Sequence, residues 1–439
     1  MNRLGAALLH APRSAAAALL VGALAIGVLF NVRRWNDRDL LRWDSDCYYL
    51  YLPATFIHHD LLALRWLETI PPGRAPDNYR FGQGVHPGKD ADHRCNKCTL
   101  GVALSELPFF LVAHAWMRST DPAHADGYAP LYQLSVGVAS AVWATLGLLV
   151  LARFLRRRCS DAVSATALLA LGLGTNLFFY ASYAGGMAHP WLFFLTALLL
   201  ERTDRWHRHQ HPRDSLWIGA VLGLAVLTRP TLALLALVPL CWNAAAPRLL
   251  LRHARTWALA AAVGALCLLP QLPYWKATTG HWLYYSYGDE GFNLSQPHVL
   301  AGLFSYRKGW FVYTPLALIA LAGLVPLVRT ADGRPYARLL LLFGVPFLYL
   351  TFSWTQWWYG GSFGSRPLID VLPLLAWPLA ALVERAGRTA TAWRVALAAL
   401  LLAGIALNLF QQWQYKQGLL LHDGMDAQRY WAVFGRLGG

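Results

Sequence analysis

Two carboxylates, Asp44 and Asp46, stand two residues apart in the aromatic stretch from Arg42 to Pro53, just after the first hydrophobic segment. If that segment crosses a membrane with its N-terminus inside, the two acids emerge on the far side, at the water-lipid boundary that Trp and Tyr rings favour. A carboxylate placed there could act as the general base of an enzyme that works on a lipid-borne substrate. Asp44 is the first candidate and Asp46 the second. The alternative interpretation is a pair of solvated acids at the start of a loop.

Cationic and aromatic side chains that could complete such a site occur in later stretches. Guanidinium and ammonium groups bind an anionic phosphate leaving group, and Trp and Tyr rings can stack on a sugar or form a belt at the lipid boundary. For Arg307 and Lys308 the alternative is a helix flank at the surface, whereas Arg366 is set among glycines before a proline. The candidates for substrate binding are Arg307, Lys308, Arg366, Arg229, Trp357, Trp358 and Tyr359.

The composition indicates a membrane protein. Of the 439 residues, 56% are hydrophobic and only 14% are charged, whereas a soluble domain has about 25% charged residues. The hydrophobic residues form repeated runs of helical span length, which favours a polytopic α-helical protein over a β-barrel. The net charge of +15 comes from arginines in short loops, where they set topology and meet anionic lipid. We therefore expect membrane lipids as partners and no nucleic acid.

The hydrophobic runs predict one all-α domain over residues 1–439, with about eleven transmembrane helices. Basic connections should be cytoplasmic, which places a first loop with interfacial helices at 32–129 and a tail at 411–439 on the periplasmic side of a bacterial inner membrane. The expected spans are Ala15–Phe30, Pro130–Phe154, Ala162–Tyr180, Pro190–Leu200, Leu216–Trp242, Trp257–Tyr274, Gly309–Leu327, Leu339–Ser353, Leu368–Val383 and Val395–Phe410.

The run Leu216–Trp242 is expected to contribute two of these crossings. Arg229 and Pro230 stand at its middle, and both of its flanks are basic. A single crossing would place one basic flank outside, and an arginine at mid-membrane would be costly. Two short helices that meet near Arg229 avoid both problems.

The candidate residues all fall on one predicted side of the membrane. A transporter needs polar groups through its spans, and the predicted span interiors are nearly free of ionisable residues. This asymmetry favours an enzyme over the alternatives, a transporter or flippase for a lipid-linked glycan and a non-catalytic scaffold. The chemistry that fits is transfer of a sugar from a polyprenyl-phosphate donor with inversion at the sugar carbon.

These features resemble the GT-C membrane glycosyltransferases, a superfamily that includes protein O-mannosyltransferases and the aminoarabinose and RgtA/B/C/D-like transferases. The similarity lies in the acidic first loop, in the Gly-Leu-Ala-x-Leu-Thr-Arg-Pro element at Gly223–Pro230, and in Lys97-Cys98-Thr99-Leu100-Gly101 with Pro108. Cys98 departs from the Lys-Tyr-Pro or Lys-Pro-Pro pattern. The resemblance implies a lipid-phosphate sugar donor, a glycan, lipid or protein acceptor, an Asp base in the first loop, and a role for Lys97 in substrate binding.

No cofactor is expected, although Asp44-Ser45-Asp46 could mark dependence on a divalent metal. Cys95 and Cys98 make half of a zinc knuckle without a second pair, so a zinc site is disfavoured. In an oxidising compartment one disulfide could form among Cys47, Cys95 and Cys98, and its pairing stays open.

Overall fold

The computed structural model of the chain describes residues 12–69, 84–243 and 246–438. Most of these residues are helical, and one two-stranded antiparallel sheet pairs β1 (Val85–Pro87) with β2 (Arg94–Asn96). In the first half the helical segments are α2 Arg13–Val32, α3 Asp44–Tyr49, α4 Tyr51–Phe56, η1 Arg65–Glu68, α5 Gly101–Thr120, η3 Pro122–His124, α6 Pro130–Arg156, α7 Asp161–Leu173, α8 Leu177–Ser182, α9 Ala188–His209, α10 Pro212–Thr228, η4 Pro230–Ala236 and α11 Leu237–Leu240.

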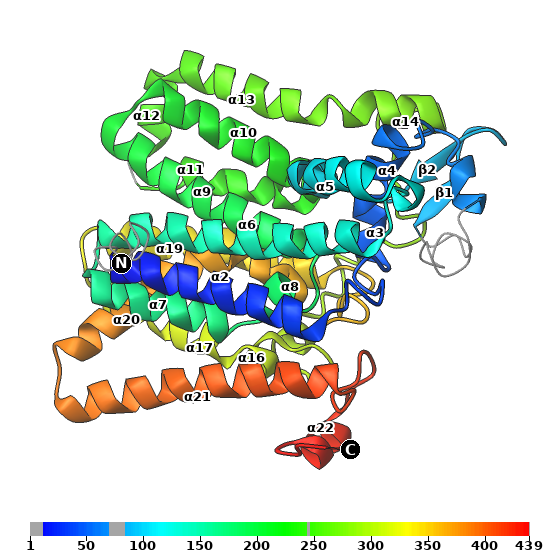
Figure 1. The fold of residues 1–439 in the computed structure, drawn as a ribbon. Coiled ribbons are helices and arrows are strands. Elements are labelled where there is room, and N and C mark those ends of the chain that lie inside the picture. Colours follow the sequence, from blue (N-terminus) through cyan, green and yellow to red (C-terminus); the bar gives the residue numbers. More distant parts are fainter. Residues whose placement is uncertain (1–11, 70–83, 244–245, 439) are drawn as a thin grey trace, which may run out of the picture.

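The second half continues the bundle of long helices that lie side by side in Figure 1. Its segments are α12 Ala246–Arg252, α13 Ala254–Leu268, α14 Gln271–Thr279, α15 Val299–Phe304, α16 Trp310–Tyr313, α17 Pro315–Ala322, α18 Leu324–Leu327, α19 Gly333–Phe352, η5 Arg366–Leu375, α20 Ala376–Gly387, α21 Thr391–Lys416 and α22 Ala427–Val433. Helix α6 is central, since it packs against α2, α5, α7 and α9.

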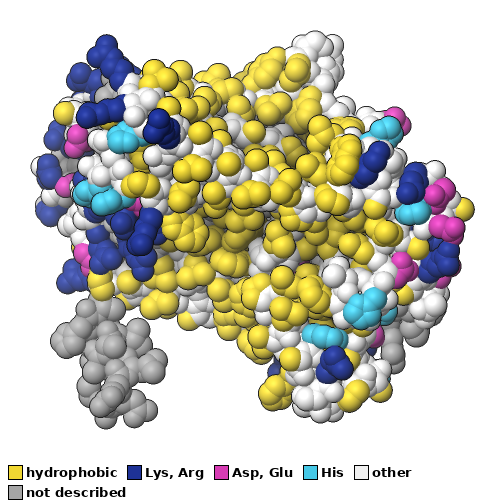
Figure 2. Space-filling model, turned by 90° about the horizontal axis from the view of Figure 1, so that it is seen from above, with side chains coloured by type: hydrophobic (Ala, Val, Ile, Leu, Met, Phe, Trp, Pro, Cys, Tyr) yellow, Lys and Arg dark blue, Asp and Glu magenta, His cyan; other side chains and the backbone are white. Residues whose placement is uncertain are grey.

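Six helical stretches among the described residues are long and apolar enough to cross a membrane, which is the arrangement of a multi-pass membrane protein. A hydrophobic surface covers the middle of the molecule, and Lys and Arg side chains gather at one end of it (Figure 2). The count of about eleven crossings stays a prediction. The six stretches are Arg13–Val32, Pro130–Arg156, Ala254–Thr279, Gly333–Phe352, Arg366–Gly387 and Thr391–Lys416.

The run Leu216–Trp242 folds as two arms, as predicted. Helix α10 ends at Thr228, and the chain turns at Arg229 into η4 and α11. The second arm returns to the end where the first began, because the Pro239 carbonyl lies 3.1 Å from Nε2 of His207, near the end of α9. Gly223 of α10 lets α13 approach closely, since a Cβ there would lie 2.3 Å from the Gly264 carbonyl oxygen. Arg229 therefore stands at the tip of the pair.

Four other predicted spans are interrupted, begin differently or are longer than expected. The run Ala162–Tyr180 divides into α7 and α8, and Gly309–Leu327 divides into α16, α17 and α18. Pro315 begins α17, where its missing N–H costs nothing, but its ring prevents α16 from continuing. The run Leu368–Val383 begins as the 3-10 segment η5, and Pro190–Leu200 is part of α9, which reaches His209.

The first loop forms a small layer at the end of the bundle opposite α12, with α3, α4, β1, β2 and the start of α5 together (Figure 1). A disulfide joins Cys47 of α3 to Cys98, just before α5, while Cys95 is free and buried. Gly101 begins α5 in contact with the end of α10, because a Cβ there would lie 2.2 Å from Oγ1 of Thr228. The loop is thereby held against the tip that carries Arg229.

Candidate active site

Asp44 and Arg366 form an ion pair between the first loop and the bundle. The Arg366 Nη2 atom lies 2.7 Å from Asp44 Oδ2, and the two side chains are 16% and 45% exposed. Each residue is the first of its helical segment, α3 or η5. Trp43, directly before Asp44, has a φ of 53°, a backbone conformation that is costly for a bulky residue.

The backbone around Asp44 is fixed by polar contacts of its neighbours. The Ser45 hydroxyl donates to the Leu40 carbonyl at 2.7 Å and lies 2.6 Å from the Arg42 carbonyl. Gln133 of α6 accepts from the Leu40 and Leu41 amides at 3.0 and 3.3 Å. The start of α3 is therefore anchored to the central helix, and Asp44 is held at a defined place on a rigid element.

The protein around the Asp44 carboxyl acts on its pKa in two directions. Removal from water raises the pKa, but the charge and hydrogen bond of Arg366, followed by the charges of Lys97 and Arg229, lower it by more. The net result is a pKa below the usual 3.8. Asp44 is therefore a carboxylate at neutral pH, which is the form that accepts a proton.

Arg229 is held at the same site by a buried acid. Its Nη1 atom lies 2.7 Å from Oδ2 of Asp370, and the other oxygen of this carboxylate lies 2.7 Å from Nδ1 of His189. The Asp370 and His189 side chains are fully buried, whereas that of Arg229 is 21% exposed. The arrangement holds the Arg229 guanidinium near Asp44, Arg366 and Lys97, which we call the Asp44 cluster. The Asp370 carboxylate neutralises part of the Arg229 charge.

Lys97 and Tyr359 lie at the edge of the cluster. The Lys97 ammonium is 2.8 Å from Oε1 of Glu290 and 4.9 Å from the centre of the Tyr287 ring. The Tyr359 hydroxyl donates to the Thr351 carbonyl at 2.8 Å. Tyr359 also has a positive φ, 57°. Both residues are predicted to bind substrate. Lys97 is close enough to act on Asp44, and Tyr359 is close to Arg229 and Arg366, so this role stays a proposal.

Arg307 and Lys308 lie in a neighbouring loop and already have partners. Arg307 binds Asp423 at 2.8 Å and stacks on the Trp358 ring at 3.7 Å. The Lys308 ammonium donates to the Ser362 carbonyl and, at 2.6 Å, to the His422 carbonyl. Burial lowers the pKa of Lys308 to about 7. Both side chains therefore contribute to the structure of the loop.

Of the predicted tryptophans, Trp358 covers the Arg307 guanidinium, and Trp357 stacks on His298 at 5.7 Å. Both are partly exposed. Within the described part of the chain, neither makes a hydrogen bond or a cation–π contact with the Asp44–Arg366 pair. Their assignment to sugar binding stays a prediction.

Asp46 lies apart from Asp44, although the two are close in sequence. Residues two apart on a helix point in different directions, and Asp46 is fully buried beside Tyr128. Substrate would reach Asp44 more readily than Asp46. In residues 12–69, 84–243 and 246–438, no three His, Cys, Asp or Glu side chains gather in the manner of a metal site.

Asp370 and His189 were not assigned a role from the sequence. Asp370 is the one carboxylate within the predicted span Leu368–Val383, and an acid within a span is a signal of function because its burial is costly. His189 follows a glycine-rich stretch and has no local motif. Only the fold brings these two residues to Arg229, since they are 181 residues apart.

No family model matches this chain, and no curated protein matches it. The site must therefore be interpreted from its own chemistry. It combines an ionised carboxylate, two guanidinium groups and an ammonium group at one end of a membrane bundle. Such a set can accept a proton from a hydroxyl and hold a phosphate beside it.

Proposed function

We propose that the chain is a membrane glycosyltransferase that moves a sugar from a polyprenyl-phosphate donor to a hydroxyl of a lipid, glycan or protein acceptor. The observation that carries the proposal is the pairing of Asp44 with Arg366, with Arg229 and Lys97 close enough to act on the same carboxyl. A base for the acceptor and cations for the leaving phosphate are the two requirements of this reaction.

In the proposed reaction the Asp44 carboxylate takes the proton of the acceptor hydroxyl, and the acceptor oxygen attacks the anomeric carbon. The bond between that carbon and the phosphate oxygen breaks, and its electron pair leaves with polyprenyl phosphate. The phosphate gains one negative charge in this step. Arg366 and Arg229 are the groups placed to stabilise it, through charge-assisted hydrogen bonds.

The ion pair also suggests an order of events. Arg366 holds Asp44 in the absence of substrate, and a bound phosphate would compete for the same guanidinium. Transfer of Arg366 from Asp44 to the phosphate would release the carboxylate for the acceptor. The base would then become available when the donor is in place.

Ionisable groups such as Asp370, His189 and Arg229 are also a feature of transporters, which carry them within their spans. Here His189 is the second residue of α9, and Asp370 is within the first five residues of η5. Both residues therefore lie near the N-terminal ends of their helical segments, and Arg366 is the first residue of η5. This position supports a reaction at one face over a path through the membrane.

The test is the release of polyprenyl phosphate, detected by mass spectrometry, from a panel of polyprenyl-phosphate sugars incubated with the purified full chain. The panel is narrowed by comparing the surface glycans and lipids of the source organism with those of a deletion strain. We expect Asp44→Asn to lower the rate by about 10²- to 10⁴-fold, the usual contribution of a general base. Arg366→Ala should raise KM for the donor more than it lowers kcat.

Asp37→Asn is the matched control, because Asp37 is an exposed acid of the same loop without a partner among the described residues. This variant should keep the parental rate. Full activity of Asp44→Asn on a donor that the parent uses would overturn the assignment of the base. If no donor is consumed and the deletion strain lacks no sugar, the proposed function itself is wrong.

A further inference from the structure

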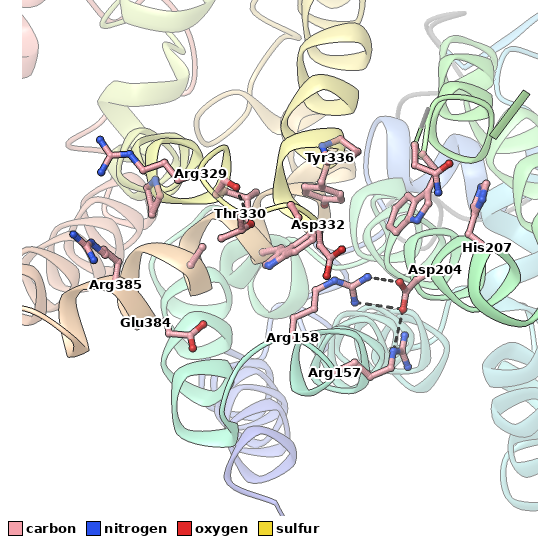
Figure 3. A pocket seen from close by; sticks show the side chains of 18 of the residues that line it. Arg157, Arg158, Asp204, His207, Arg329, Thr330, Asp332, Tyr336, Glu384 and Arg385 are labelled. Carbon is pink, nitrogen blue, oxygen red and sulfur yellow. Dashed lines mark hydrogen bonds and ion pairs between the residues drawn. The ribbon is translucent and has the colours of Figure 1, made fainter. Parts of the chain in front are cut away.

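A cavity of about 900 Å³ lies at the arginine-rich end of the bundle, opposite the Asp44 cluster. Its walls come from the ends of α6, α9 and α20 and from the connection between α18 and α19 (Figure 3). This volume is within the range of small-molecule sites, about 300–1,000 Å³. None of the residues assigned to the proposed reaction lines it.

The charge of the lining is strongly positive. Six arginines and three carboxylates line the cavity. Asp204 binds Arg157 at 3.0 Å and also binds Arg158 and Arg208, while Glu384 binds Arg388 at 2.6 Å. Two of the three acids are thus neutralised by a subset of the arginines, while the third, Asp332, makes no ion pair with a described residue.

Arg329 and Arg385 are left without such partners. Across the described residues neither guanidinium makes an ion pair or a hydrogen bond, and Figure 3 shows both on one side of the cavity, away from the Arg158–Asp204 pair. Arg158 adds a further donor, because its side chain is only 7% exposed and its Nε atom has no partner.

One wall of the cavity is apolar. Leu327, Trp377 and Ala381 contribute to it. Val325 and Val328, next to this wall in sequence, are 57% and 41% exposed. A ligand with an anionic part and an apolar part would find both kinds of surface here.

We propose that this cavity binds a phosphate-bearing anion, with Arg329 and Arg385 as its principal ligands. Arginine is suited to phosphate because its planar donors match two phosphate oxygens at once. Two sources share this chemistry, the headgroup of an anionic membrane lipid and a soluble phosphate ester. Basic pockets between transmembrane helices bind lipid headgroups in other membrane proteins.

The experiment measures binding to the full chain in uncharged detergent by native mass spectrometry, with phosphatidylglycerol, phosphatidylcholine, glycerol 3-phosphate and inorganic phosphate as probes at constant ionic strength. We expect saturable binding of a phosphate probe by the parent. The double variant Arg329→Gln/Arg385→Gln should bind at least about tenfold more weakly, the effect of about 1.4 kcal/mol. Since neither side chain has a partner to lose, the variant should fold normally, which its thermal unfolding will check.

The matched control is Arg248→Gln/Arg252→Gln, which removes the same charge from exposed arginines of α12, at the same end of the molecule but outside the cavity. It should bind as the parent does. Tighter binding of phosphatidylglycerol than of phosphatidylcholine and the soluble probes assigns the site to a lipid headgroup. If glycerol 3-phosphate binds as tightly as phosphatidylglycerol and is weakened as much by Arg329→Gln/Arg385→Gln, the site is assigned to a soluble ester. Absence of saturable binding, or equal losses in both double variants, would overturn the proposal.

Discussion

Asp370→Asn is the change that most directly tests how Arg229 is held. The substitution keeps the shape of the side chain but removes a fully buried charge that contacts Arg229 and His189. Breaking a buried ion pair by removing one partner typically costs about 3–5 kcal/mol. Because the Arg229 side chain is 21% exposed, water relieves part of the penalty, and we expect the lower end, about 3 kcal/mol. That is about 150-fold in the unfolding equilibrium.

The assay is reversible unfolding of the purified full chain in mixed micelles, paired with the KM for the donor. Asp370→Asn should lose stability and raise KM together, since Arg229 is no longer oriented. The double variant Arg229→Met/Asp370→Leu removes both charges, and its stability should return close to that of the parent while KM stays high. If Asp370→Asn unfolds within about 1 kcal/mol of the parent and keeps its KM, the ion pair does not hold Arg229 in the way described.

Three further predictions concern other parts of the chain. Burial holds the pKa of Lys308 at about 7, below its usual 10.5. Between these two pH values the unfolded chain binds more protons than the folded chain, so stability should rise with pH from about 7 towards 10. Thermal unfolding at a series of pH values should show this rise in the parent and not in Lys308→Met. The Cys47–Cys98 bridge spans 51 residues, so Cys47→Ser/Cys98→Ser should lose up to about 4 kcal/mol of stability in denaturant unfolding. Cys95 is free, so Cys95→Ser should keep the bridge, and reductant should still lower the stability of this variant. A phosphatase reporter that requires the periplasm should be active when fused after Leu437, and activity of only a cytoplasmic reporter there would contradict the topology.

The sequence was sufficient to predict the helical membrane class and the arms that meet at Arg229, because hydrophobic runs and basic flanks are local signals. It could not predict where a run breaks into shorter helices, as at Pro315, because proline can either kink or end a helix. The disulfide partner of Cys47 was likewise open, since a pairing of Cys47 with Cys98 or Cys95 depends on tertiary distances that the sequence does not carry.

The candidate site shows the same division. Residue type and the predicted side of the membrane were enough to propose Asp44, Arg366 and Arg229. They were not enough to predict which of these residues contact one another. Asp370 and His189 contribute by holding Arg229, through contacts that form only when the chain is folded. The helix geometry that separates Asp46 from Asp44 is a local fact, and it could have been anticipated had α3 been expected to begin at Asp44.

The two arms that meet at Arg229 are short. The 17 residues of α10 extend about 26 Å, and η4 and α11 together extend about 20 Å, against a hydrocarbon core of about 30 Å. The bilayer beside this hairpin must become thinner to match it, at a cost that grows with each ångström of mismatch. Arg229, at the tip of the short arms, therefore lies closer to the bilayer centre than the ends of longer helices such as α6. In the proposed reaction, bilayer thickness, which acyl-chain length sets, therefore decides how far the lipid-borne phosphate must travel to reach this guanidinium.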